Sequence, residues 1–96
     1  MVSTGLVALL DQLEAVVRAA AEEELRLGPT WLADLSVANI DTVSELRTAA
    51  HAGRLMPGPG FDLTAMLGES WVELHDEVDA LVAQINDLLN AHRHAT

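Results

Sequence analysis

Residues 67–88 read LGESWVELHDEVDALVAQINDL, and apolar side chains recur through them at alternating spacings of four and three. The members of this late seam are Leu67, Trp71, Leu74, Val78, Leu81, Ile85 and Leu88. Such spacing places all of them on one face of an α-helix. Because a continuous apolar face has to be buried, the late seam predicts a long helix over residues 62–93 that packs on another helix.

A second seam lies near the start of the chain. Its members, at spacings of four, three, four and three, are Leu6, Leu10, Leu13, Val17 and Ala20. They predict a first helix over residues 4–27. Gly28 and Pro29 should end this helix, because Gly suits a left-handed C-cap and Pro cannot continue the hydrogen-bond ladder.

The middle of the chain has a weaker pattern. Residues 30–52 are predicted to be helical, either as one bent helix or as two pieces with a break near 36–41. The run Thr42-Val43-Ser44-Glu45 has the form of a capping box, which favours a restart at Asp41 or Thr42. Gly53 should end this part.

A turn is predicted over residues 54–60, where two Pro-Gly pairs follow each other. Asp62 or Thr64 can cap the helix that comes next. Within that helix, Gly68 and a second possible capping box that begins at Ser70 suggest a kink. Since the late seam continues through this point, a kink is favoured over a break.

Composition indicates one small all-α domain, residues 1–96. Half of the residues are apolar and only 3% are aromatic, so the core has to come from Leu, Val, Ile and Ala. These side chains suit helix packing better than a sheet rich in aromatic and β-branched residues. The expected architecture is an antiparallel three- or four-helix bundle in which the two seams pack together, with dimerisation as one way to complete it.

The charge is strongly negative: fifteen acids and five bases, all of them Arg, give −10. This field repels phosphate backbones and anionic membranes, so neither nucleic acid nor membrane is expected as a partner. Cysteine is absent, which excludes disulfides and thiolate chemistry. Without a bilayer-length apolar run or a basic signal region, the chain is expected to be cytoplasmic or, alternatively, exported without a cleaved signal peptide.

The acidic face of the late helix is the main candidate for chemistry. It consists of Glu69, Glu73, Asp76 and Glu77, which share one stripe, with His75 and Asp79 nearby. Several carboxylates on one face are able to hold a divalent cation, but a solvated face opposite an apolar seam has the same pattern. The solvated face is the preferred interpretation, so neither a metal nor a cofactor is expected. Without a nucleophile elbow, phosphate loop or dinucleotide fingerprint, no catalytic residue is predicted and the chain is not expected to be an enzyme.

Two tryptophans remain. Trp71 belongs to the late seam and is expected in the core or in an interface. Trp31 follows the Gly28-Pro29 turn, where a large ring either plugs the end of the bundle or contacts a partner protein.

The stretch from Gly60 to Leu89, in which Met66 to Trp71 leads into a long helix, resembles the W-x-G helical hairpins that are substrates of type VII secretion in actinobacteria. The resemblance covers roughly a third of the chain. It implies pairing with a helical partner and export without a cleaved signal. The chain departs from the family where Leu-Ala follows Trp31 and Val-Glu follows Trp71, so that W-x-G is absent. It also has no Tyr for a Y-x-x-x-D/E export signal, and its turn lies near residue 58.

These observations predict a small acidic helical protein–protein interaction module that works as a homo- or heterodimer. The contact would be carried by the late seam and Trp31, against a second copy or another helical protein. One alternative is an acidic inhibitor or nucleic-acid mimic that presents the acidic face to a basic site on its target. A further alternative is a metal-binding helical bundle.

Overall fold

Five α-helices make up nearly all of the part that the computed structural model describes, residues 4–53 and 62–94. They are α1 (Thr4–Leu27), α2 (Thr30–His51), α3 (Leu63–Leu67), α4 (Glu69–Glu73) and α5 (Asp76–His94). The described residues contain no strand, so the predicted all-α class is confirmed. The turn predicted over residues 54–60 lies outside the described residues.

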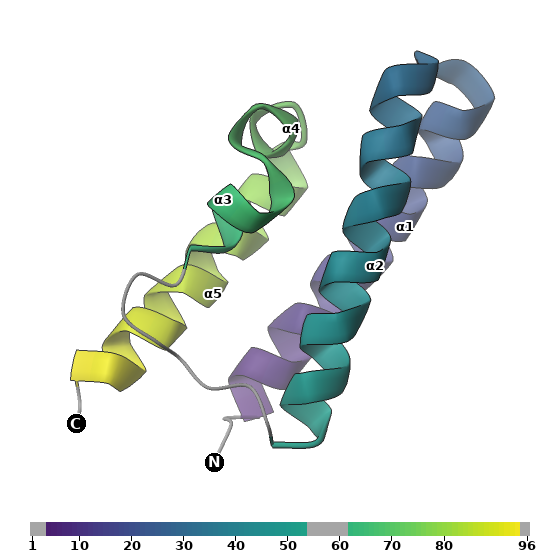
Figure 1. The fold of residues 1–96 in the computed structure, drawn as a ribbon. Coiled ribbons are helices and arrows are strands. Elements are labelled where there is room, and N and C mark those ends of the chain that lie inside the picture. Colours follow the sequence, from purple (N-terminus) through teal and green to yellow (C-terminus); the bar gives the residue numbers. More distant parts are fainter. Residues whose placement is uncertain (1–3, 54–61, 95–96) are drawn as a thin grey trace.

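The two long helices α1 and α2 form a hairpin that turns at Gly28 and Pro29 (Figure 1). The predicted end of the first helix is confirmed, but its mechanism differs. Gly28 does not take a left-handed conformation; its N–H donates to the carbonyl of Glu24 at 2.9 Å. Pro29 then adopts an extended backbone and serves as the N-cap of α2. Pro29 pushes the residue before it, Gly28, away from helical geometry. Its own ψ of 144° then turns the chain into α2.

Helix α2 runs unbroken through residues 36–41, so the version with two pieces is wrong. The predicted break contains two polar residues, Ser36 and Asn39, of a type that often bonds to its own backbone. Here both are buried and bond to other helices. Thr42 is not a cap either, since its hydroxyl donates to the carbonyl of Ala38 one turn back within the helix, at 3.5 Å. The helix ends near Gly53, whose φ is +70°, as the sequence predicts.

The single long helix predicted over residues 62–93 is wrong, because the chain forms α3, α4 and α5 instead. Asp62 caps α3 as expected and accepts the N–H of Thr64 at 3.0 Å. Gly68 separates α3 from α4 with φ +97° and ψ +116°, a backbone outside the helical region, so the predicted kink is a break. Ser70 therefore lies inside α4 and does not cap it. A second break follows at Leu74 and His75, between α4 and α5.

The core forms where α5 packs on α1 and where α3 and α4 close the space beside α2. The two seams meet there: Leu6, Leu10, Leu13 and Val17 are buried, as are Leu67, Trp71, Val78, Leu81 and Ile85. Leu74 is the main exception, since its side chain is 60% exposed. Leu88 is also exposed, and Leu89 is buried in its place. Each break resets the rotation of the helix, and a straight helix also drifts from a seven-residue repeat, so the spacing fails at these points.

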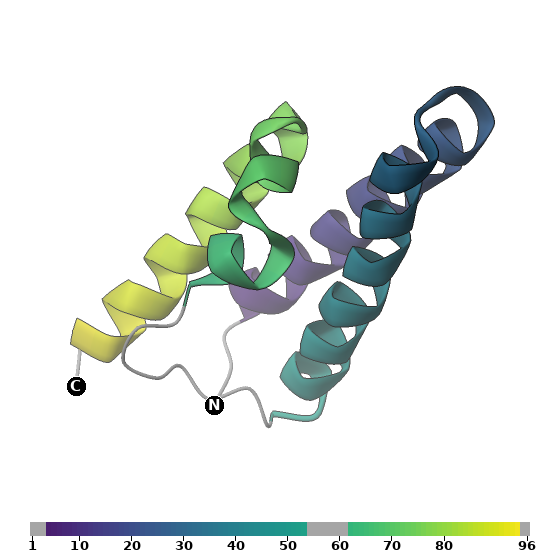
Figure 2. The ribbon, with the colours of Figure 1, turned by 45° about the horizontal axis from the view of Figure 1, so that its top comes forward.

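A charged cluster joins α1 to α2 away from the turn. Arg47 of α2 contacts Asp11 and Glu14 of α1, with 3.1 Å between Arg47 Nη1 and Glu14 Oε2. Arg18 and His51 complete this cluster, at 2.9 Å from Glu14 and 3.1 Å from Asp11 respectively. The cluster links α1 and α2 away from the turn. The tip of the hairpin, at that turn, stands apart from α3, α4 and the start of α5 in both overall views (Figures 1 and 2).

Candidate functional site

Four side chains from three parts of the chain meet in a polar junction: Glu24 of α1, Ser36 of α2, Trp71 of α4 and His75 at the corner between α4 and α5. Trp71 Nε1 donates to Ser36 Oγ at 2.8 Å, and Ser36 Oγ donates to Glu24. His75 Nε2 lies 2.5 Å from the other Glu24 oxygen, and His75 Nδ1 lies 2.7 Å from the Trp71 carbonyl. The junction therefore fixes the corner between α4 and α5 against the hairpin.

The geometry of the junction does not activate Ser36 as a nucleophile. A serine nucleophile needs its hydroxyl bonded to a base that can take the proton, usually an imidazole. Here the hydroxyl lies between a carboxylate and an indole N–H, while His75 bonds to the carboxylate. Ser36 is also 0% exposed, so a substrate cannot reach it. What the junction supplies is position, because buried polar groups with all their partners in place hold one arrangement of helices.

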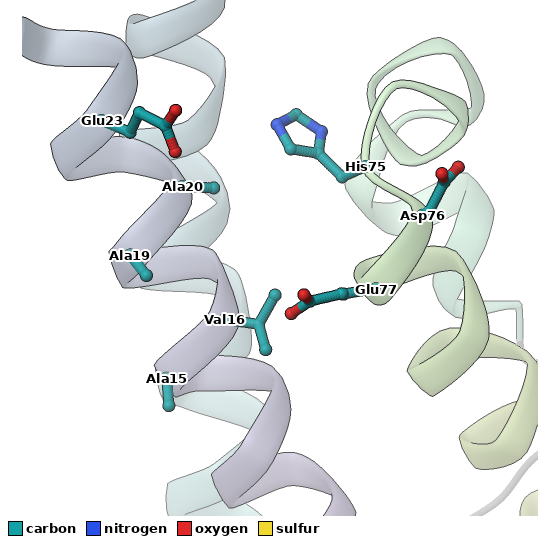
Figure 3. A pocket seen from close by; sticks show the side chains of 8 residues that line it. All are labelled: Ala15, Val16, Ala19, Ala20, Glu23, His75, Asp76 and Glu77. Atoms are coloured by element: carbon teal, nitrogen blue, oxygen red, sulfur yellow. The ribbon is translucent and has the colours of Figure 1, made fainter.

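Beside the junction lies an open groove between α1 and the start of α5, with a volume of about 520 Å³ (Figure 3). Residues of α1 line one side of the groove, and the small apolar ones among them are called its floor. The corner between α4 and α5 lines the other side (Figure 3). The lining residues of this α1–α5 groove are Ala15, Val16, Ala19, Ala20, Glu23, His75, Asp76 and Glu77. The groove therefore combines an apolar floor with carboxylates on both walls.

The predicted interface residues of the late seam fall into two sets. Five of them, Leu67, Trp71, Val78, Leu81 and Ile85, are buried in the chain's own core. Leu74 and Leu88 are exposed and belong to different helical surfaces, because α5 begins only at Asp76. In this conformation the seam is thus covered by the hairpin, with α1 packed on α5 and α2 on α3 and α4, and any surface offered to a partner has to lie elsewhere.

Trp31 lies at the tip of the hairpin with its side chain 59% exposed, so it does not plug the end of the fold. Three other large apolar side chains near the same turn are exposed as well. The four residues Leu25, Leu27, Trp31 and Leu35 are called the apolar tip. The sequence pattern indicates Trp31 as a contact residue, but it does not indicate the three leucines. They could have been recognised from the sequence as large apolar residues that belong to neither seam and lie near a turn.

The acidic face is split by the second helix break. Glu69 and Glu73 belong to α4, whereas Asp76 and Glu77 belong to the first turn of α5, and all four are exposed. Asp76 and Glu77 line the α1–α5 groove, and the other two do not. The described residues hold no group of three or more His, Asp or Glu placed to bind a metal ion.

Among the helices described, none is both long enough and apolar enough to cross a bilayer. Comparisons with protein-family models, with curated proteins and with solved structures give no match. The function is therefore argued from the surfaces of this chain.

Proposed function

We propose that this protein is a small acidic docking module that binds another helical protein through the apolar tip. The observation that supports this most is the exposure of Trp31 and of Leu35, which lies four residues further along the same face of α2, with Leu25 and Leu27 exposed near the end of α1. Soluble monomers rarely expose large apolar side chains in a group, and such groups usually mark a contact surface. Trp is also the residue type most enriched among the side chains that dominate binding energy.

Charge favours a different protein over a second copy of this chain. Each copy carries −10, so self-association brings like charges together, and this repulsion opposes a homodimer. A partner whose rim is neutral or basic meets no such repulsion. In this proposal the partner's helices pack beside α1 and α2 and complete a bundle of three or four helices.

A second candidate function is an acidic inhibitor that presents carboxylates to a basic site on its target. Asp76 and Glu77 favour it, because both are exposed at the rim of a groove whose lining includes no Lys or Arg. The two functions differ in their response to salt. Contact through the apolar tip should change little with ionic strength, whereas contact between surface charges weakens steeply.

The test uses the full chain to capture its partner from a host extract, and then measures the Kd with the purified partner. Trp31→Ala should weaken binding roughly thirtyfold, corresponding to about 2 kcal/mol for a dominant aromatic contact. Val37→Ala is the matched control, since Val37 is an exposed apolar residue on the same helix. It points about 120° away from Trp31 around the helix axis.

The proposal predicts that capture survives 1 M NaCl and depends on Trp31 and not on Val37. Capture that is lost in salt and unaffected by Trp31→Ala would support the acidic inhibitor instead. Circular dichroism of each variant checks that the helices are retained.

A further inference from the structure

We propose that the α1–α5 groove binds a basic amphipathic helix, with small or aliphatic side chains on its inner face and Lys or Arg on both flanks. This inference rests on the proposed function as a docking module, and it adds the chemistry of the partner segment. It concerns a different surface from the apolar tip. The two surfaces can therefore be tested separately.

The floor of the groove suits the close approach of a helix. Ala15, Ala19 and Ala20 carry no side-chain atom beyond Cβ, and Val16 beside them is small. The distance between two packed helix axes depends on the side chains at the contact, and small side chains give the lower end of the range, about 8 Å. Ala15 and Ala19 are exposed, so an incoming helix would remove apolar surface from water.

The helix dipole accounts for only some of the carboxylates that line the groove. Asp76 and Glu77 occupy the first turn of α5, where the helix dipole favours carboxylates. Glu23 lies just before the last turn of α1, where the dipole does not favour a carboxylate. Its neighbour Glu24 is accounted for by the polar junction, but Glu23 faces the groove (Figure 3).

Two carboxylates point into the groove from opposite sides, Glu23 from α1 and Glu77 from α5, whereas the carboxylate of Asp76 points away from α1 (Figure 3). Like charges on facing walls repel each other, and a cation placed between them relieves that repulsion. The lining residues include no Lys or Arg that does so. Charge complementarity therefore calls for a cationic occupant.

Charge disfavours a second copy of the chain as the occupant. Each copy carries −10, and two of its five Arg, Arg18 and Arg47, are already paired with Glu14. An amphipathic helix instead supplies an apolar stripe flanked by charges at fixed spacing, which matches an apolar floor between acidic walls. His75 holds the second wall in place through its bond to Glu24, so the groove is formed before the helix binds.

The test measures fluorescence anisotropy of a labelled helical peptide added to the full chain. The probe is a peptide of about 21 residues, or six turns, with Ala and Leu on one face and Lys on both flanks. Glu23→Gln combined with Glu77→Gln should weaken binding about 5- to 20-fold, since each surface charge pair typically contributes about a two- to fivefold change. Ala19→Leu fills the floor and should weaken binding at least as much.

The matched controls lie on α2 and line no part of the groove. Glu45→Gln removes an equal type of charge from an exposed site, and Ala38→Leu adds the same volume to an exposed alanine. Each should change the Kd by less than about twofold, as is usual for surface sites away from a contact. Thermal denaturation confirms folding, and the charge variants keep the test decisive should Ala19→Leu not fold.

Several outcomes would overturn the proposal. One is equal binding of a scrambled peptide of the same composition, which would show plain attraction between opposite charges. Equal weakening by Glu45→Gln and by the Glu23 and Glu77 changes would show the same. If spermidine, added at the same total positive charge as the peptide, displaced the peptide fully, the groove would be a site for small cations and not for a helix. Trp31→Ala should leave peptide binding unchanged, so failure of the groove is distinguishable from failure of the apolar tip.

Discussion

Ser36 is fully buried in α2, and its hydroxyl serves two other helices at once. It donates to the Glu24 carboxylate of α1 and accepts the indole N–H of Trp71 in α4. Without that oxygen, the buried indole N–H has no acceptor and one Glu24 oxygen loses its donor. An unsatisfied buried donor costs more free energy than an average hydrogen bond contributes, because its desolvation is not compensated.

Ser36→Ala is therefore expected to lower the free energy of unfolding by about 1–3 kcal/mol. Urea denaturation measures this loss of unfolding free energy, and the m-value should not change. Ser44→Ala is the matched control, since Ser44 lies half-buried on the same helix, and it should stay within about 0.5 kcal/mol of the parent. Equal stability of the two variants would show that the junction contributes nothing to folding.

Residues with local partners were predictable, and residues with distant ones were not. Asp62 was expected to cap a helix, and its acceptor role two residues along the chain is confirmed. Asn39 donates to the carbonyl of Leu67, a partner 28 residues away, and no local pattern indicates that bond. The helix break predicted near residues 36–41 is wrong for the same reason, because Ser36 and Asn39 within it link α2 to other helices.

At the scale of elements, Gly68 determines how the C-terminal part is divided. Its φ of +97° is rarely adopted by a residue with a Cβ, and it lets α3 and α4 point in different directions. Asn39 also binds the carbonyl just before it, that of Leu67, which keeps this break close to α2. The seam spacing continues through Gly68, so apolar periodicity alone predicts one helix.

Gly68→Ala should destabilise the protein by about 1–3 kcal/mol, because it forces a side chain onto a backbone conformation suited to glycine. Space is not the cause, since a Cβ at this position would meet nothing closer than Trp71 Cβ at 3.9 Å. Gly5→Ala provides the contrast: Gly5 lies in the first turn of α1, where Ala should be neutral or slightly stabilising. Thermal denaturation by circular dichroism compares them. A Gly68→Ala variant as stable as Gly5→Ala would contradict this account.

The long helices were more predictable than the short ones. The bounds of α1 follow from a regular seam and a Gly-Pro stop, and the structure confirms them. The break at Leu74 and His75 carries neither glycine nor proline. His75 bonds to Glu24 and to the carbonyl of Trp71, so tertiary contacts fix this break. That second break is why Leu74, on the predicted seam, lies in solvent.

Across the whole molecule, a net charge of −10 works against compactness, and ion pairs between helices offset part of that repulsion. Asp11 and Arg47 form one such pair between α1 and α2. The hydrogen bond from Arg47, with a further one from His51, lowers the pKa of Asp11 below its ordinary value of 3.8. The same pair raises the pKa of Arg47, which stays charged throughout.

This shift sets a direction for stability against pH. A carboxylate with a lowered pKa in the folded state stabilises that state above the unfolded pKa, and the contribution is lost as pH falls through the folded value. The difference in unfolding free energy between the parent and Asp11→Asn should thus have its largest value near pH 6 and become smaller below about pH 4. Asp34→Asn removes the same charge from exposed α2 and controls for net charge. A difference that stays constant down to pH 2.5 would contradict the role of the pair.

The candidate binding surfaces were only partly accessible to sequence reasoning. Trp31 was identified because a large ring beside a turn is unusual, and it is indeed exposed. Asp76 and Glu77 were identified as part of an acidic face. Glu23, which faces them, lies more than fifty residues earlier. Only the crossing of α1 and α5 brings these carboxylates to one groove, and seam spacing does not specify where two helices cross.

The hairpin of α1 and α2 is built from neighbouring segments, whereas α5 packs on α1 from the far end of the sequence. During synthesis the hairpin is therefore complete while the last helix is still unmade. Contacts that are local in sequence form early and fast, so α1 and α2 pair first. Until α5 has left the ribosome, the face of α1 on which it packs is not covered. This interval is when the nascent chain is most exposed to aggregation and most open to a chaperone.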